Sequence, residues 1–323
     1  MTAVLPDGLT IRAPTMDDAE AIAALANACR LAEGGTATLT AEEIRYAWQT
    51  AGSDFNLAAN TWAVVTPEGK LVAYADLFQR GYVAFSMVGW THPEYCGQGI
   101  GTYLLRLVEA RAIQQIPAAP PRARISIKSV SISHKNDAAR LLVEQEGYRL
   151  ARHVWEMMIE MDSAPPASAW PEGMTIRTFI PDQDLHPVYA AIEEAFQDHW
   201  NHTPTPLEDW EQRVKRKGFD PTLWFLALDG KEIAGAALCR SDSGTALVGQ
   251  LAVRRPWRRQ GLGMALLRHA FGEFYRRGKH QVILTVDSQN PTGATRLYER
   301  AGMRVIWQYD TYEKELRPGT GCV

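Results

Sequence analysis

The apolar residues of this chain follow two spacings that alternate along its length. Short apolar runs such as Trp62–Val65 and Trp224–Ala227 end at glycine-containing turns, a pattern typical of buried strands joined by hairpins. Longer stretches carry apolar residues every three or four positions, as on a helix, and the clearest stripe consists of Leu266, Leu267, Ala270, Phe271 and Phe274. Each half predicts a strand, helices, a strand meander, a long helix, a strand, a helix and a final strand. This succession is typical of a mixed α/β (α+β) sheet domain.

The same succession occurs twice, in the same order. Gly8–Arg12 matches Gly173–Arg177, and the apolar run that starts at Trp62 matches the run that starts at Trp224. Two further pairs of landmarks follow in register: Gly99-Ile100-Gly101 with Gly261-Leu262-Gly263, and Glu146-Gly147-Tyr148 with Ala301-Gly302-Met303. The segment 161–173 is rich in Pro, Ala and Ser, as linkers are. We therefore predict two tandem domains, residues 1–165 and 166–323.

Composition and charge narrow the class of protein. The chain has 323 residues, 46% of them hydrophobic and 22% charged, with a net charge of -3. These values are ordinary for a globular protein and give no reason to expect a nucleic-acid partner or a membrane surface. No signal-peptide pattern starts the sequence and no apolar run has the roughly 18 residues of a membrane span, which predicts a cytoplasmic protein. Reduced thiols are expected at the four widely spaced cysteines, Cys29, Cys96, Cys239 and Cys322.

A basic, glycine-containing turn in the C-terminal half is suited to bind an anion. The apolar strand Gln250–Val253 runs into Arg254–Gly263, and a predicted helix follows. Small residues let a ligand approach the backbone, and the N–H groups and dipole of a helix start favour phosphate. A pyrophosphate fits this turn, and Arg258 and Arg259 add charged donors. The alternatives are a plain connecting turn, or a dinucleotide-binding turn at Gly97–Thr102. The position of the glycines after a meander argues against the latter.

The motif Arg258-Arg259-Gln260-Gly261-Leu262-Gly263 resembles the Arg/Gln-x-x-Gly-x-Gly/Ala signature of the GCN5-related N-acetyltransferases. The segment from Asn290 through Leu297-Tyr298 to Gly302 resembles the second coenzyme A motif of that family. The resemblance implies two tandem domains of this type, acetyl-CoA as co-substrate and no metal. The implied acetyl-CoA contacts are Leu251, Ala252, Val253, Arg258, Arg259, Gln260, Gly261, Leu262, Gly263, Met264 and Asn290.

Acyl transfer from a thioester needs an acid for the departing thiolate and a way to deprotonate the amine. By similarity to the family, Tyr298 is the general acid; the alternative is a tyrosine that only packs. The family often has a glutamate on the strand before the turn, but here Leu247–Leu251 contains no carboxylate. Asp287 and the cluster Asp198-His199-Trp200-Asn201-His202 are the candidate routes for the proton. Trp200 and Trp210 form either an acceptor wall or core.

The N-terminal half lacks parts of this machinery. Cys96 stands where the signature has Arg or Gln, and Val143 stands in the place of the tyrosine. We therefore expect structural support from this half rather than chemistry.

These features predict N-acetylation of a primary amine on a small molecule. The tandem arrangement is similar to two-domain acetyltransferases of the mycothiol synthase type, whose acceptor is a cysteinyl pseudodisaccharide. That narrower activity is one alternative, and a non-catalytic acyl-CoA sensor is another. The sequence does not identify the acceptor, and a homodimer is compatible with it.

Overall fold

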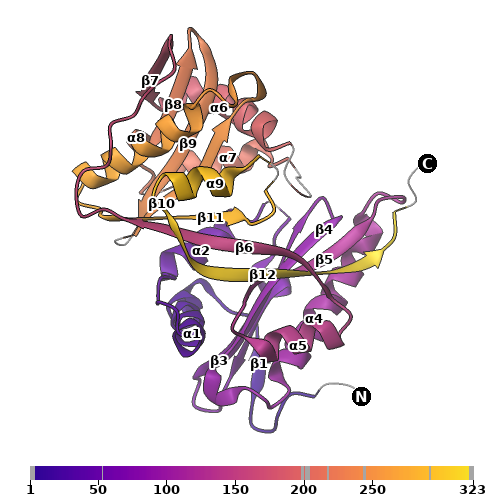
Figure 1. Ribbon diagram of the computed structural model, residues 1–323. Helices are drawn as coiled ribbons and strands as arrows, with labels where there is room; N and C mark the ends of the chain where they lie inside the picture. The colour runs from indigo at the N-terminus through magenta and orange to yellow at the C-terminus, as the bar shows by residue number, and fades with distance from the viewer. Residues whose placement is uncertain are drawn as a thin grey trace. The chain divides into compact units, whose positions relative to one another are not determined.

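The computed structural model describes residues 4–52, 54–197, 200, 204–216, 218–242, 245–290 and 292–319. Backbone contacts divide the chain into two compact units: residues 1–153 with 308–323 form unit 1, and residues 154–307 form unit 2 (Figure 1). No helix within the described ranges is long and apolar enough to cross a membrane.

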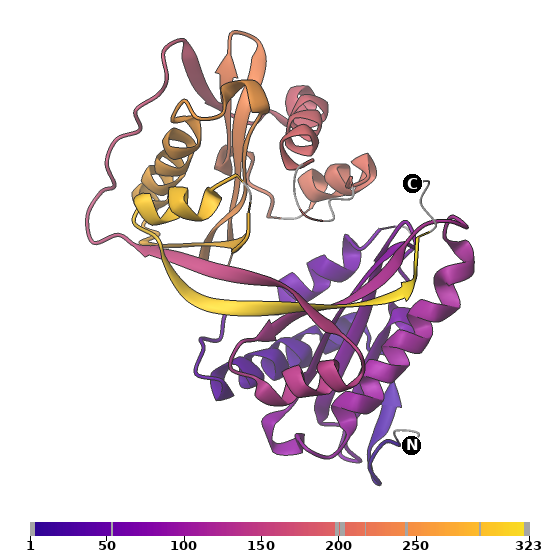
Figure 2. The same ribbon diagram turned by 45° about the vertical axis from the view of Figure 1, so that its right-hand side comes forward.

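Unit 1 is a sheet with helices on both faces. Its strand order is β1-β2-β3-β4-β5-β12, antiparallel except for the parallel pair β4 and β5. Helices α4 and α5 pack on one face, and α1 and α2 pack on the other (Figure 2). The strands are β1 Thr10–Arg12, β2 Thr61–Val65, β3 Leu71–Arg80, β4 Ala84–Thr91, β5 Ile125–Ser133 and β12 Arg304–Arg317. The helices are η1 Met16–Asp18, α1 Ala19–Ala32, α2 Ala41–Gln49, α3 Leu57–Asn60, η2 Pro93–Tyr95, α4 Ile100–Gln115, η3 Ile116–Ala118 and α5 Asp137–Gln145.

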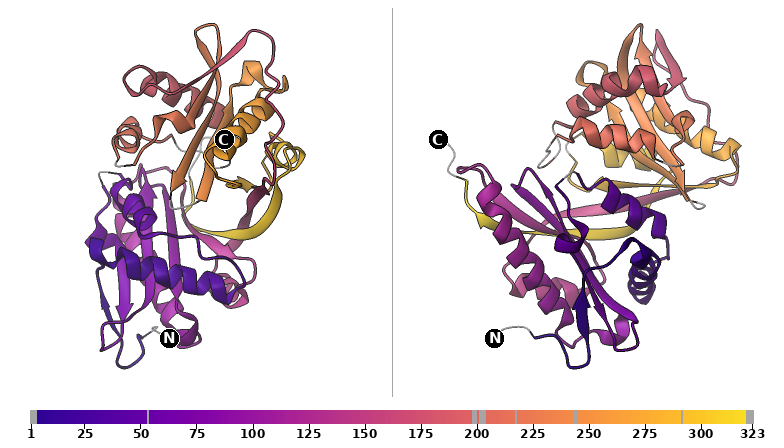
Figure 3. Two further views of the ribbon diagram at one scale, coloured as in Figure 1. Left: turned by 90° about the vertical axis from the view of Figure 1, so that its left-hand side faces the viewer. Right: turned by 180° about the vertical axis from the view of Figure 1, so that it is seen from behind.

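Unit 2 repeats this architecture. Its strand order is β6-β11-β10-β9-β8-β7, with β10 and β11 parallel. Helices α8 and α9 pack on one face and α6 and α7 on the other, as the right-hand panel of Figure 3 shows for α6 and α7. The strands are β6 Arg149–Glu160, β7 Met174–Thr178, β8 Trp224–Asp229, β9 Glu232–Asp242, β10 Thr245–Val253 and β11 Gln281–Asp287. The helices are α6 Pro181–Phe196, α7 Leu207–Lys215, η4 Pro221–Leu223, η5 Arg255–Trp257, α8 Leu262–Arg276 and α9 Ala294–Arg300.

The last strand of each sequence copy belongs to the sheet of the other copy. Residues 154–160 of β6 pair with β11, and residues 309–317 of β12 pair with β5. A duplicated sequence allows this exchange because each copy offers nearly the same partner edge. The boundary predicted near residue 165 separates the sequence repeats, whereas the compact units divide within β6 and β12.

The predicted helical stripe after the glycine turn lies on α8, and all of its residues are buried: Leu266, Leu267, Ala270, Phe271 and Phe274. They pack with β8, β10 and β11 into one apolar cluster, which fixes α8 on the sheet. The mixed α/β architecture with two tandem domains is confirmed.

Strand β10 is bulged and has an open edge near its end. Its register against β9 shifts between Val248 and Gln250, so that Gly249 is the extra residue. Its parallel pairing with β11 covers Ala246 and Leu247, and residues 248–253 pair on the β9 side. The corresponding strand of unit 1, β4, pairs with β3 without any shift. The bulge therefore distinguishes unit 2 from unit 1.

Candidate functional site

A cavity of about 710 Å³ opens beside the start of α8 in unit 2. Four segments enclose it: the end of α6, the end of β10, the glycine turn with the first residues of α8, and helix α9. The lining consists of Ala195, Phe196, Leu251, Ala252, Val253, Trp257, Arg258, Arg259, Gly261, Leu262, Gly263, Met264, Thr292, Gly293, Ala294, Arg296, Leu297, Tyr298 and Arg300. The fold thus brings together every predicted site residue except Gln260 and Asn290.

The turn presents unsatisfied backbone amides to the cavity. Gly261 caps α8 in the left-handed conformation, with φ of 86°. Ala265 makes the first bond of the helical ladder, from its N–H to the Gly261 carbonyl at 3.0 Å. The N–H groups of residues 262–264 therefore precede the ladder, as at every helix start. Together with the helix dipole they are suited to bind an anion.

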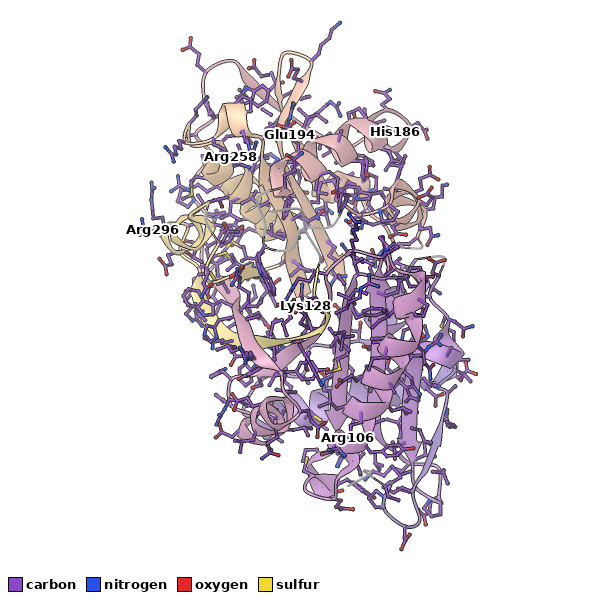
Figure 4. All side chains as sticks on the ribbon, turned by 90° about the vertical axis from the view of Figure 1, so that its right-hand side faces the viewer. Arg106, Lys128, His186, Glu194, Arg258 and Arg296 are labelled. Carbon is purple, nitrogen blue, oxygen red and sulfur yellow. The ribbon has the colours of Figure 1, made fainter. Side chains whose placement is uncertain are left out.

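Arg258 and Arg259 have different roles, although they are neighbours. The Arg258 guanidinium donates to two backbone carbonyls, that of Val253 from Nε at 3.0 Å and that of Ala195 from Nη2 at 3.0 Å. It thereby ties the end of β10 to the last turn of α6, and Figure 4 labels it there. Arg259 is exposed, has φ of 64°, and forms no ion pair within the part of the chain that the structure describes. Of these two neighbours, Arg259 thus has its charge available to a ligand.

The second glycine of the motif lets α9 approach α8. A Cβ atom on Gly263 would lie 3.2 Å from Cδ2 of Leu297 and 3.7 Å from Cγ2 of Val253. A side chain here would push α9 away from the turn. Unit 1 keeps the same contact, because a Cβ atom on Gly101 would lie 3.2 Å from Cδ2 of Leu142.

Tyr298 projects from α9 into the cavity. Its side chain is 7% exposed, and burial raises its pKa to about 12. The phenol therefore keeps its proton at neutral pH, as a general acid must before it acts. Its hydroxyl makes no hydrogen bond with any described residue, so the proton is available to a group bound in the cavity.

Gln260 and Asn290 bond within their own turns instead of lining the cavity. The Gln260 side-chain amide donates to the Pro256 carbonyl at 3.1 Å. The Asn290 Oδ1 accepts from the N–H of Thr292 at 2.9 Å and from its hydroxyl at 2.5 Å, which shapes the entry to α9. Acetyl-CoA contacts at these two residues, as at the other predicted residues, stay predictions.

The structure places the residues proposed to take up the amine proton, or to form the acceptor wall, in different surroundings. The Asp287 Oδ1 accepts from the Gln289 N–H at 2.8 Å, and Asp287 does not line the cavity. Of the cluster at 198–202, only Trp200 lies among the described residues, and it is half-buried. Trp210 is 1% exposed and packs against Tyr189 and Trp224, so it belongs to the core.

Sequence reasoning missed several parts of this site. Arg296 and Arg300 on α9 line the cavity, and Gly249 forms the bulge in β10. Two arginines four positions apart on a short helix, and a glycine inside an apolar strand, were the available signals.

The corresponding region of unit 1 carries no arginine at these places. Cys96 and Gly97 replace Arg258 and Arg259, while Gly99 keeps the left-handed helix cap, with φ of 84°. The Thr91 carbonyl, the counterpart of the Val253 carbonyl, accepts from the Cys29 thiol at 3.2 Å. Burial and the nearby Glu33 carboxylate raise the pKa of the Cys96 thiol. A carboxylate close to this turn works against a bound anion.

Val143 takes the place of Tyr298 on α5 and is buried in the core of unit 1. The unit therefore has no hydroxyl at the position where unit 2 has its candidate acid.

Comparison with known proteins shows the family of both halves of the chain. The model of the acetyltransferase (GNAT) family matches residues 20–125 and 185–303, one region in each half. A mycothiol acetyltransferase of Thermobispora bispora is 31% identical over 228 residues, which cover 68% of this chain and 72% of that protein. A mycothiol acetyltransferase of Streptomyces bingchenggensis is 32% identical over 265 residues, 77% of each chain.

The crystal structure of a GCN5-related N-acetyltransferase from Sphaerobacter thermophilus has a TM-score of 0.84 and 40% identity, and 99% of each chain is covered. Both halves of the sequence match the family, and the residues that line the cavity lie within the second matched region. The chain is an acyltransferase and belongs to the acetyltransferase (GNAT) family.

Proposed function

We propose that unit 2 transfers the acetyl group of acetyl-CoA to a primary amine of a small molecule. One observation carries the proposal: a single cavity joins the amide cradle at the start of α8 to the buried phenol of Tyr298. Binding alone would need the cradle, whereas acyl transfer also needs an acid at the leaving group. This juxtaposition favours an enzyme over a sensor.

The described residues suit three parts of acetyl-CoA: the pyrophosphate, the pantetheine arm and the thioester. The amides of residues 262–264 and the Arg259 guanidinium would hold the pyrophosphate. The open edge of β10, at Leu251–Val253, would pair with the amides of the pantetheine arm as an added strand does. Acetyl-CoA supplies the activated thioester. Tyr298 would protonate the sulfur as the amine nitrogen bonds to the carbonyl carbon and the carbon–sulfur bond breaks.

The acceptor has a narrower candidate. Relatives named mycothiol acetyltransferase align with 68% to 77% of this chain and with 72% to 77% of their own length, which supports a cysteinyl glycoside whose amine is acetylated. Gln250 stands on the strand where that type of enzyme carries a carboxylate, and its Oε1 accepts from Arg213 at 3.3 Å. The amine proton would therefore leave by another route, through water. The cytoplasmic location and a homodimer also stay predictions.

A product screen tests the function. The purified chain would be incubated with acetyl-CoA and a panel of amino acids, polyamines, aminoglycosides and cysteinyl glycosides, and acetylated products would be followed by mass spectrometry. Acetylation of the amine of one panel member supports the proposal, and acetylation of the cysteinyl glycoside supports its narrower form. Tight acetyl-CoA binding with no product on any acceptor would favour the sensor.

A further inference from the structure

Two arginines of α9 stand at the outer rim of the cavity. Arg296 and Arg300 are four residues apart and therefore share one face of the helix. Both side chains are exposed and both line the cavity, whereas Tyr298 between them points inward and is buried (Figure 4 labels Arg296). Helix α9 thus contributes to the cavity a buried phenol, that of Tyr298, and two exposed guanidinium groups.

Neither arginine has an anionic partner among the residues that the structure describes. Several other arginines of unit 2 form ion pairs, such as Arg254 with Glu194 and Arg304 with Glu160. Arg296 and Arg300 form no ion pair or side-chain hydrogen bond within the described ranges. Like charges four residues apart on one face of a helix repel each other, and a bound anion would relieve this repulsion.

The other half of the same chain shows that the fold does not require these charges. Leu297 and Leu142 occupy the same place, because each contacts the second glycine of its turn. Counting from these leucines, Arg296 corresponds to Leu141 and Arg300 to Gln145. Leu141 is 47% exposed, so the position tolerates even an apolar side chain in water. The arginines are therefore present in unit 2 for a reason other than packing.

We propose that Arg296 and Arg300 bind the 3′-phosphate of coenzyme A and make unit 2 selective for CoA thioesters over 3′-dephospho-CoA thioesters. The inference rests on the proposed function, because it concerns the same cavity. Coenzyme A carries two separate phosphate groups, a pyrophosphate and a ribose 3′-phosphate one sugar ring away. The helix start and Arg259 can hold the first group. The paired guanidinium groups on α9 supply donors for the second.

The test compares acetyl-CoA with acetyl-3′-dephospho-CoA. Calorimetry would give the Kd of each thioester for the wild-type chain and for a variant with Arg296→Leu and Arg300→Gln, which copies the residues of α5. Both replacements are good helix formers, so α9 should persist. Arg276→Gln, in the last turn of α8, is the control for the loss of a positive charge elsewhere. Circular dichroism and the thermal midpoint would check folding.

We expect the wild type and the control to prefer acetyl-CoA by about tenfold or more, and the double variant to lose most of that preference. Its Kd for the dephospho form should stay within about twofold of the wild-type value, since that ligand lacks the group that the arginines bind. Equal binding of both thioesters by the wild type, or a preference unchanged in the double variant, would overturn the inference while leaving the transferase intact. Failure of the wild type to bind either thioester would overturn the proposed function and this inference together.

Discussion

Single residues of this chain reveal function where they depart from what the fold alone favours. Arg259 has φ of 64°, in a region where glycine is at ease and other residues are strained. The counterpart in unit 1 is Gly97, with φ of 78°. The arginine costs about 1 kcal/mol of backbone strain, so its side chain must serve a purpose that glycine cannot.

Arg259→Gly should therefore separate stability from binding. We expect a thermal midpoint equal to or above that of the wild type, because the strain is relieved, and a Kd for acetyl-CoA about tenfold weaker or more, because a phosphate contact is lost. Differential scanning fluorimetry and calorimetry would measure the two quantities. A lower midpoint with unchanged affinity would contradict this role.

Asp76 is a second residue that departs from expectation, in the core of unit 1. Its carboxylate accepts from the Tyr74 hydroxyl at 3.1 Å and from the Val88 N–H at 3.0 Å. Burial nevertheless raises its pKa to about 7. Between the unfolded value, near about 4, and that folded value, the native state binds more protons than the unfolded state. Stability therefore falls as pH rises through this window.

We expect the stability of unit 1 to decrease between about pH 4 and pH 7, by up to about 4 kcal/mol, and to level off above. Asp76→Asn keeps an acceptor for the Val88 N–H and has no proton to lose, so it should flatten this dependence. The urea midpoint of each protein across the pH range is the measurement. Parallel curves for the two proteins would show that another group is responsible.

At the scale of elements, the strands show what the sequence could predict. The order of helices and strands, the α8 stripe and the glycine turn follow from apolar spacing and turn chemistry. The match of Trp62 to Trp224 is wrong by one residue: Trp62 packs in the cluster with α4, and Trp224 packs in the cluster with α6. Both strands are apolar on both faces, so an alternation of apolar and polar residues does not fix how the two copies align. An alignment shifted by one residue assigns every side chain to the wrong face of the sheet.

The sequence could predict neither the bulge in β10 nor the exchange of strands between the two sheets. Gly249 adds one residue to β10, and a glycine in a strand indicates a bulge without proving one. Strands β6 and β12 could each pair with β5 or with β11. Because the two copies of the sequence are similar, their edges are nearly equivalent, and the sequence does not show which pairing forms. The predicted residues of the continuous motif line one cavity with Tyr298, except for Gln260, whereas the two arginines of α9 that also line it, Arg296 and Arg300, were not predicted. Which side chains of α9 meet the turn depends on the packing of elements distant in sequence, which one sequence does not give.

Arg258 joins two elements of unit 2, strand β10 and helix α6. Its guanidinium bonds to the carbonyls of Val253 on β10 and Ala195 on α6. Arg258→Gln should lower the stability of unit 2 by about 1–3 kcal/mol, since two charged hydrogen bonds are lost. Chemical denaturation of Arg258→Gln and of Arg259→Gly would measure the free energy of unfolding of each variant. We expect it to fall in the first variant and to stay equal or rise in the second. Equal stability of the two variants would refute the division of roles between them.

At the scale of the whole molecule, the two units share a fold and differ in the charged side chains around the glycine turn. Arg258, Arg259, Arg296 and Arg300 surround the cavity of unit 2, and Cys96, Gly97, Leu141 and Gln145 replace them in unit 1. Glu33 adds a carboxylate near the turn of unit 1 and accepts from Asn136 at 2.7 Å. Phosphate binding depends chiefly on such charges.

We therefore expect one acetyl-CoA to bind per chain. Isothermal titration would give the stoichiometry, and the double variant Gly261→Asp with Gly263→Asp should abolish binding, because carboxylates would enter the cradle. The matched change in unit 1, Gly99→Asp with Gly101→Asp, should leave the stoichiometry at one. A second site in the wild type that only the unit 1 variant removes would show that both cradles work.

The central claim is that chemistry occurs in unit 2 with Tyr298 as the acid, and the turnover number of Tyr298→Phe tests it most directly. Tyr148→Phe is the matched control, because Tyr148 is a buried tyrosine of unit 1 whose hydroxyl has no hydrogen-bond partner among the described residues. At saturating acetyl-CoA, with the acceptor found in the screen, Tyr298→Phe should lower kcat about a hundredfold or more and leave the Kd for acetyl-CoA nearly unchanged, while Tyr148→Phe keeps wild-type kcat. A Tyr298→Phe variant with the full kcat of the wild type would contradict the account.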